Sequence, residues 1–143
     1  MNSISVDVAG VPIAQGSLVG NPRFGGLRYS NDALLKEWRG RIIDSLSASR
    51  PDNWEPEKAM SVYAEFRFVR PNSHFGKKGK RPSAPRFKTT KPDLDKNARA
   101  IGDCIEQAGL VRNDSQIVHW VLSKRWARKD EAPGVSLTLS AQT

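Results

Sequence analysis

The chain has 143 residues, the length of one ordinary domain, and a hydrophobic fraction of 38% that can form a packed core and excludes a disordered basic tail. Its 23 Lys and Arg residues against 15 Asp and Glu residues give a formal net charge of +8, which favours a polyanionic partner, most often nucleic acid. No apolar run approaches the roughly 18 residues of a transmembrane helix, and the N-terminus lacks a signal-peptide pattern, so we expect no membrane association.

The first 60 residues predict a strand, a loop and a helix. Apolar and polar residues alternate at the start of the chain, which is the period of a half-buried strand, and the apolar positions are Ile4, Val6 and Val8. Residues 16–26 predict a long loop because they are rich in glycine and contain Pro22. A helix is expected next, with Ser30 or Asn31 as its cap. Its apolar residues recur near helical spacing, at Leu35, Trp38, Ile42 and Leu46.

A second strand and a basic loop are expected after a proline-containing connection at residues 50–57. Apolar residues alternate along the predicted strand, at Val62, Ala64, Phe66 and Phe68. Residues 66–92 then hold no acid and nine basic residues: Arg67, Arg70, Lys77, Lys78, Lys80, Arg81, Arg86, Lys88 and Lys91. Glycines and prolines interrupt regular structure through the middle of this stretch. We therefore predict a mobile basic loop at about residues 70–91, within one domain that spans residues 1–143.

The last third of the chain predicts a helix and two strands. Apolar residues at spacings of four and three share one face from about Leu94 to Ala108, and Gly109 occupies a position that commonly ends a helix. Residues 116–126 and 135–139 predict two closing strands, joined by a turn at residues 129–134. The resulting order, β-α-β-loop-α-β-β, predicts a single α+β domain.

Three aspartates stand out in this basic chain. Asp93 and Asp95 lie at the start of the second predicted helix, and Asp114 lies just before the next strand. Clustered carboxylates that hold Mg²⁺ or Mn²⁺ activate the water that attacks a phosphodiester, and they stabilise the leaving oxygen. Asp103, two turns beyond Asp95, is a fourth acid that is able to complete such a cluster. The alternative stays open that these acids are ordinary helix caps and turn residues.

The single cysteine and the two histidines exclude several kinds of metal site. The single cysteine, Cys104, excludes an internal disulfide and a multi-cysteine zinc site. His74 and His119 are too far apart for a zincin-type motif, and we expect His74 to be a loop residue. Because Cys104 lies between two core positions of its helix, we predict a structural role for it. This cysteine usage is typical of a reducing cytoplasm.

Two neighbouring segments form a two-part acidic motif. Residues 91–103 run Lys-Pro-Asp-Leu-Asp-Lys-Asn-Ala-Arg-Ala-Ile-Gly-Asp, and Gly109 is followed at 113–118 by Asn-Asp-Ser-Gln-Ile-Val. This pattern resembles the RusA family of Holliday-junction resolvases, whose members carry Pro-Asp-x-Asp, a helix rich in basic residues, a glycine and an acid-acid-x-Gln segment. Residues 70–74 and 123–125 resemble the versions found in bacteriophages and prophages. The resemblance covers roughly residues 62–139, and before residue 60 it is looser.

The resemblance implies that Asp93, Asp95 and Asp114 are catalytic acids that bind Mg²⁺, for which Mn²⁺ can substitute, without a small-molecule cofactor. It also implies a mixed sheet with packed helices, a homodimer, and nicking of branched DNA in the cytoplasm of a bacterial cell or phage-infected host. This sequence departs from the family at two positions. The family's functional lysine, four residues after the second acid, is Arg99 here, and the acid pair is reduced to Asn113-Asp114. We expect Arg99 to contact phosphate in catalysis or, alternatively, to pair with Asp95 one turn away.

The main prediction is an endodeoxyribonuclease that resolves four-way Holliday junctions by paired symmetric nicks in DNA recombination and repair. The residues expected to bind DNA are Lys77, Lys78, Lys80, Arg81, Arg86, Lys88, Lys91 and Lys96. Two alternatives remain: a nuclease for other branched DNA such as flaps and forks, and a non-catalytic basic nucleic-acid-binding module. The enzyme requires all three aspartates and a divalent ion, whereas the binding module tolerates Asp95→Asn.

Overall fold

The computed structural model describes residues 2–16, 18–20, 27–29 and 32–143. In this part of the chain, two α-helices and four longer strands form the body of the molecule. The longer strands are β1 (Ser3–Ala9), β4 (Met60–Phe68), β7 (Ile117–Trp126) and β8 (Gly134–Ala141), and the helices are α1 (Asp32–Ala48) and α2 (Leu94–Gln107). The connections contain β2 (Leu18–Gly20), β3 (Leu27–Tyr29), β5 (Phe75–Gly76), β6 (Gly79–Lys80), and the 3₁₀ turns η1 (Asn72–His74) and η2 (Asp114–Gln116).

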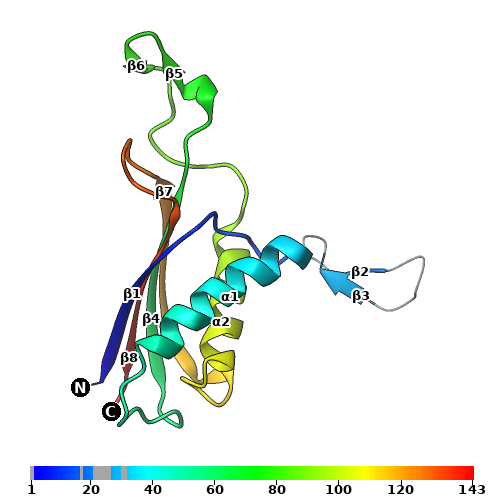
Figure 1. The fold of residues 1–143 in the computed structure, drawn as a ribbon, viewed down its shortest axis with the longest axis vertical. Helices are drawn as coiled ribbons and strands as arrows, with labels where there is room; N and C mark the ends of the chain where they lie inside the picture. Colours follow the sequence, from blue (N-terminus) through cyan, green and yellow to red (C-terminus); the bar gives the residue numbers. More distant parts are fainter. Residues whose placement is uncertain (1, 17, 21–26, 30–31) are drawn as a thin grey trace.

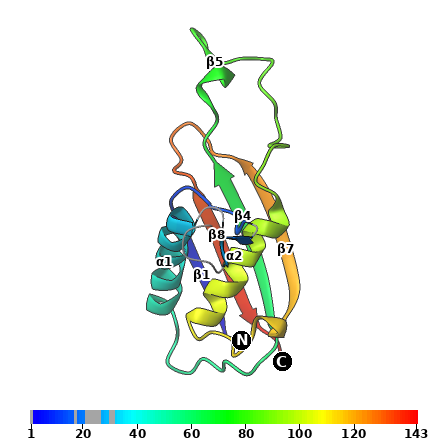
Figure 2. The same ribbon diagram turned by 90° about the vertical axis from the view of Figure 1, so that its right-hand side faces the viewer.

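The main sheet is mixed and has the strand order β1-β8-β4-β7. Strand β8 lies antiparallel to both of its neighbours, β1 and β4, whereas β4 and β7 are parallel. Figures 1 and 2 show α1 and α2 packed side by side on one face of this sheet, and α2 belongs to the connection that joins the parallel pair. The chain is thus a single α+β domain with one layer of helices on one layer of strands.

Residues 70–91, here called the basic arm, leave the sheet at the end of β4 and return to the start of α2. Figure 1 shows the arm projecting beyond the body of the molecule, with the β5–β6 hairpin near its tip and the two chain termini at the opposite end. In the hairpin, Phe75 pairs with Lys80 and Gly76 with Gly79. The glycine backbone at 79, with φ of +94°, permits the tight turn.

The core lies between the sheet and the two helices. Strand β4 is central, and its alternate residues Val62, Ala64 and Phe66 are fully buried against the helix layer. The apolar stripe of α1 that the sequence predicted is buried at all four positions: Leu35, Trp38, Ile42 and Leu46. Helix α2 has the same arrangement, with Ile101 and Ile105 fully buried. None of the described helices is long and apolar enough to cross a membrane.

The strongly periodic elements were predicted correctly, as were the connection at residues 50–57 and the turn at 129–134, whereas two of the predicted loops contain regular structure. The first strand, both helices, the strand at Val62–Phe68 and both closing strands are confirmed, and Gly109 ends α2 with φ of +76°. The loop prediction for residues 16–26 was wrong at Leu18–Gly20, which pairs with β3. Residues 17, 21–26 and the predicted caps Ser30 and Asn31 lie outside the described residues. The basic loop also contains more regular structure than expected, because η1 and the β5–β6 hairpin interrupt it.

Strand β8 begins where the backbone leaves no room for a side chain. A Cβ atom at Gly134, whose φ is +159°, would overlap the carbonyl of Val8 and lie 2.7 Å from the guanidinium of Arg67. Arg67 is only 4% exposed and bonds to Asp7 at 2.7 Å. Glycine at position 134 therefore lets β1, β8 and the Arg67 side chain meet closely at this end of the sheet.

A second arginine closes the same end of the sheet. Arg125 donates two hydrogen bonds to the carboxylate of Glu131, at 2.6 and 2.8 Å, and a third to Glu65 at 3.1 Å. These bonds tie β7 and β4 to the connection that leads into β8. The hydrogen bonds from Arg125, followed by one from the Arg128 backbone, lower the pKa of Glu131 from 4.5 to about 2.

Glu131→Gln is expected to reduce stability in a pH-dependent manner. Because the folded-state pKa is depressed, ionised Glu131 stabilises the fold fully above pH about 4.5, and this contribution is lost as pH falls towards about 2. Urea unfolding at several pH values between 7 and 2.5 should show a gap between wild type and variant that narrows below about 4.5. Glu57→Gln is the control, because its ion pair with Arg112 is exposed on both sides. A gap that does not change with pH would contradict the assignment.

Candidate active site

The first two predicted acids lie at the N-terminus of α2. Asp93 occupies the N-cap position, but its side chain makes no capping hydrogen bond. Instead the buried side chain of Asn97 donates to the carbonyl oxygen of Asp93 at 3.2 Å, alongside the regular helix bond from its backbone N–H. Within the described part of the chain, the exposed carboxylates of Asp93 and Asp95 have no hydrogen-bond or ion-pair partner. The role of an ordinary cap, the alternative for Asp93, is therefore not realised.

Asp114 is the first residue of η2, and other side chains cap that turn. The Asn113 side chain accepts a hydrogen bond from the Ser115 N–H at 2.9 Å. The backbone N–H of Asp114 donates to the carboxylate of Glu106 on α2 at 2.9 Å, which fixes η2 against the helix. The Asp114 carboxylate is exposed and, among the described residues, has no partner of its own.

Gln116 locks η2 in place from the other side. Its Oε1 atom accepts from the backbone N–H groups of Arg112 and Asn113, at 2.9 and 3.0 Å. Its Nε2 atom donates to the carbonyls of Pro56 and Lys58, at 2.8 and 2.9 Å. One side chain thus makes four hydrogen bonds and attaches η2 to the segment before β4. The glutamine of the two-part motif therefore fixes the turn that begins at Asp114.

Asp95 and Asp114 lie along one face of α2, but the three acids do not form a single cluster among the described residues. A Cβ at Gly102 would lie 3.9 Å from the Asp114 Cβ and 4.0 Å from its Oδ2, so glycine makes room for Asp114 on the helix. Asp95 precedes Gly102 by seven residues, which is two turns or about 10 Å along the axis. Within the described residues, no three Asp, Glu, His or Cys side chains are grouped closely enough to hold a metal ion. The structure places Asp93 and Asp95 at the N-terminus of α2, and Asp114, on η2, beside Gly102 farther along that helix.

The other charged residues of α2 are separated by face. Arg99 lies between Asp95 and Gly102 on the acid-bearing face, is exposed, and makes no ion pair with Asp95 or another described acid. Its guanidinium is therefore available for a phosphate. Asp103 instead pairs with Arg39 of α1 at 3.8 Å and lies on the helix–helix side.

The predicted DNA-binding residues occupy two regions. Lys77, Lys78 and Lys80 are exposed at the tip of the arm, whereas Lys91 and Lys96 lie beside the acid pair. The remaining three are engaged within the chain. Arg81 donates to the Phe75 carbonyl at 3.2 Å, and Arg86 lies over the ring of Phe87 at 5.2 Å. The Lys88 ammonium donates to the Lys91 carbonyl at 2.8 Å.

A comparison with models of protein families assigns the chain to a family. The model for the family described as "Endodeoxyribonuclease RusA" matches residues 14–140, nearly the whole length. The chain belongs to the RusA endodeoxyribonuclease family. It is therefore a nuclease, and its family is one of metal-dependent Holliday-junction resolvases that act in recombination. The match begins well before the segment from residue 62 on which the sequence resemblance rested. A comparison with curated proteins found no match.

RusA-family nucleases are metal-dependent, and the donor set of this chain suits a hard divalent cation. Asp93, Asp95 and Asp114 supply unpaired carboxylate oxygens, the ligands that Mg²⁺ and Mn²⁺ prefer. Cys104 is excluded as a ligand because it is fully buried, and burial raises the pKa of its thiol to about 12. Among the described residues these three carboxylates are not grouped around one point.

Sequence reasoning missed a cluster at the base of the arm. Trp126 lies at the end of β7. The guanidinium of Arg70 lies 5.3 Å from the centre of its ring and the ammonium of Lys88 lies 4.8 Å from it. The ring of His74 packs edge-on against Trp126, with 5.1 Å between the ring centres. Burial, and secondarily the charge of Lys124, lower the pKa of Lys88. Both legs of the arm are therefore attached to one aromatic side chain. The periodicity of β7 predicts a packed Trp126, but no local signal identifies its partners.

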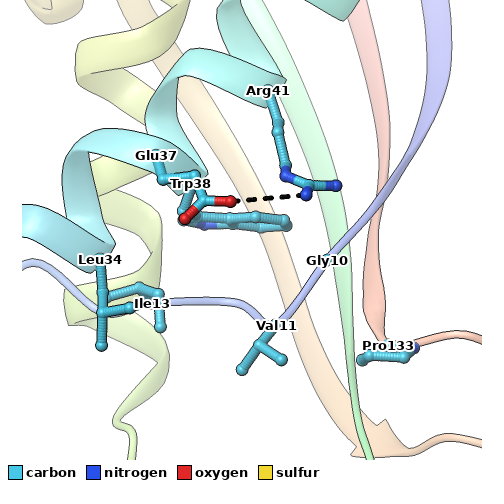
Figure 3. A pocket seen from close by; sticks show the side chains of 8 residues that line it. All are labelled: Gly10, Val11, Ile13, Leu34, Glu37, Trp38, Arg41 and Pro133. Carbon is cyan, nitrogen blue, oxygen red and sulfur yellow. Dashed lines mark hydrogen bonds and ion pairs between the residues drawn. The ribbon is translucent and has the colours of Figure 1, made fainter.

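The molecule also has an apolar pocket of about 380 Å³ between the end of β1 and α1, shown in Figure 3. Gly10, Trp38 and Pro133 line it, and an ion pair between Glu37 and Arg41 at 3.5 Å crosses its rim. None of the predicted site residues lines this pocket. The pocket is therefore separate from the residues predicted to form the active site.

Gln116→Ala is expected to lower the free energy of unfolding by about 2–3 kcal/mol, because four hydrogen bonds of ordinary net strength are removed. Urea unfolding monitored by circular dichroism measures the change. Gln142→Ala is the matched control, since that side chain makes one exposed local bond to Ser140. Equal losses in the two variants would show that Gln116 does not fix η2.

Proposed function

We propose that this chain resolves four-way DNA junctions by paired symmetric nicks, using Mg²⁺, or Mn²⁺ in its place, held by Asp93, Asp95 and Asp114. The observation that carries the proposal is the RusA-family match over residues 14–140, which includes the two-part motif that holds these acids. All three carboxylates are exposed and lack a partner among the described residues. They are therefore accessible to a metal ion from solvent.

Each residue has a distinct role in this proposal. A bound divalent ion supplies an activated water and neutralises the charge that develops on the phosphate. Asp93 and Asp95 bind on the arm side of the site and Asp114 on the side of Gly102. Arg99, between them on the same helix face, contacts the phosphate, and its planar guanidinium suits two phosphate oxygens. The basic arm, with Lys91 and Lys96, binds the flanking backbone.

The proposed assembly is a homodimer in the cytoplasm of a bacterial cell or phage-infected host, with no membrane and no small-molecule cofactor. Two sites related by a two-fold axis match the symmetry of a four-way junction. A surface for the second copy is the sheet face opposite the helices, which no described helix covers. There Tyr63 and Val121 lie side by side in register, 42% and 44% exposed. The mass of the protein in solution, measured by light scattering, tests this assembly.

The deciding experiment is cleavage of a labelled synthetic four-way junction with Mg²⁺, Mn²⁺ or EDTA. A flap, a replication fork and a linear duplex of the same sequence are the comparison substrates. Paired symmetric nicks in the junction alone, dependent on metal, are the expected result. Preferred cutting of flaps or forks would contradict the four-way junction as substrate and favour a nuclease for other branched DNA. Binding without cutting under all conditions would support a non-catalytic nucleic-acid-binding module.

A further inference from the structure

Lys124 of β7 reaches the segment that leads into the acid pair. Its ammonium donates to the carbonyl oxygen of Thr90 at 2.8 Å and to that of Pro92 at 3.0 Å. The residue that follows Pro92 is Asp93, the first of the three acids. Lys124 therefore binds the backbone one residue from the proposed metal ligand.

Lys124 starts from a rigid position. It lies in the long strand β7, paired in register with the fully buried Phe66 of the central strand β4. Its side chain is half-buried, and no described acid forms an ion pair with it. An ammonium that donates to two converging carbonyls makes charge-assisted hydrogen bonds, which are stronger than neutral ones. The sheet is thus connected directly to the turn at residues 90–92.

A second lysine binds the same turn from the arm. The ammonium of Lys88 donates to the Thr90 hydroxyl at 2.9 Å and to the Lys91 carbonyl at 2.8 Å. In the described part of the chain, the carbonyls of residues 90–92 accept from no group except these two ammoniums. Among the described residues, these two lysines thus make the hydrogen bonds that attach the backbone carbonyls of the turn to the arm and to the sheet.

We propose that Lys124 is a positioning residue for the acid pair: it holds the turn at residues 90–92 so that Asp93 and Asp95 face the bound metal together. This inference rests on the proposed metal-binding role of the two acids. Lys124 itself does not touch the metal or the DNA. Its loss should leave DNA affinity intact and weaken the order of the first turn of α2, metal binding and the cutting step.

The test compares Lys124→Met with Lys129→Met, which removes the same charge from the exposed connection between β7 and β8. Hydrogen exchange of the peptide that covers residues 88–98 reports the order of the turn, including the Asn97 amide bonded to the Asp93 carbonyl. We expect about tenfold faster exchange there in Lys124→Met, unchanged exchange elsewhere, and wild-type exchange in Lys129→Met.

Three activity measurements accompany the exchange experiment. In Lys124→Met, cutting of a saturated junction should slow about tenfold, and the Mn²⁺ concentration for half-maximal rate should rise. Junction binding in EDTA should stay within about twofold of wild type. Unchanged exchange at residues 88–98 would overturn the proposal. Weaker junction binding with an unchanged cutting rate would also overturn it and would make Lys124 a phosphate contact. If wild type never cuts, the proposed function fails, whereas the exchange result still decides whether Lys124 holds the turn.

Discussion

Asp95→Asn is expected to reduce metal-dependent junction cleavage by about a thousandfold or more. The substitution preserves the size of the side chain and removes the charge that binds a divalent ion, which contributes several kcal/mol to the transition state of phosphodiester hydrolysis. Asp95 makes no hydrogen bond or ion pair with a described residue, so the fold should not change. The measurement is the single-turnover rate with Mg²⁺ at saturating enzyme, together with the melting temperature.

Junction binding should separate the chemical role of Asp95 from a role in DNA affinity. In EDTA the variant should bind the junction as tightly as wild type or more tightly, since one carboxylate fewer repels the phosphates. Asp44→Asn, an exposed acid on α1 without a described partner, is the matched control and should cut normally. Normal cutting by Asp95→Asn would exclude Asp95 as a metal ligand.

Asp114→Asn tests whether the two ends of the acid-bearing face form one site. Asp114 lies about two helical turns from Asp95, beside Gly102. If both carboxylates hold metal in one site, Asp114→Asn should lose cleavage as severely as Asp95→Asn, and the double variant should lose little more, because residues that act as a unit are not additive. Full activity of Asp114→Asn would restrict the site to the N-terminus of α2.

The elements that sequence could predict are those whose burial is periodic along the chain. In β4, alternate residues such as Val62 and Phe66 face the helices, and in α2 the spacing of Ile101 and Ile105 marks the buried face. The order of the strands was beyond reach, because β8 enters the sheet between β1 and β4 and not beside β7, the strand that precedes it. Such long-range pairing depends on contacts that no local pattern encodes.

The candidate site divides in the same way. Residue type and spacing single out Asp93, Asp95 and Asp114. Only the structure shows that side-chain hydrogen bonds of Asn97 and Asn113 fix the first turn of α2 and the turn η2. A sequence cannot distinguish an aspartate that caps a helix from one that stands at the cap position with its carboxylate free. The contacts of Lys88 and Lys124 were equally hidden, because both lysines bond to backbone carbonyls, which every residue possesses.

Lys77→Gln combined with Lys78→Gln is expected to weaken junction binding by about 60-fold at 0.1 M salt, if each lysine neutralises one phosphate. Counterion release gives a slope of about 0.9 per neutralised phosphate in a plot of log affinity against log salt concentration, so two lysines account for a slope of about 1.8. Relative to 1 M salt, 0.1 M salt is one logarithmic unit lower, so removing both lysines lowers the logarithm of the affinity by about 1.8 at that concentration. Both lysines are exposed at the turn of the β5–β6 hairpin and have no described partner, so the arm should keep its structure.

The slope of the salt dependence, measured in EDTA between about 0.05 and 0.3 M salt, tests the mechanism more strictly than a single affinity. It should fall by about 1.8 in the double variant. A control with the same loss of charge, Lys36→Gln with Lys58→Gln, changes one residue of α1 and one of the segment before β4, both outside the arm. If both double variants lose affinity equally, only the net charge of the chain matters. A loss confined to the arm variant, with the cutting rate of the saturated junction unchanged, assigns the arm to DNA binding and leaves the chemistry to the face of α2.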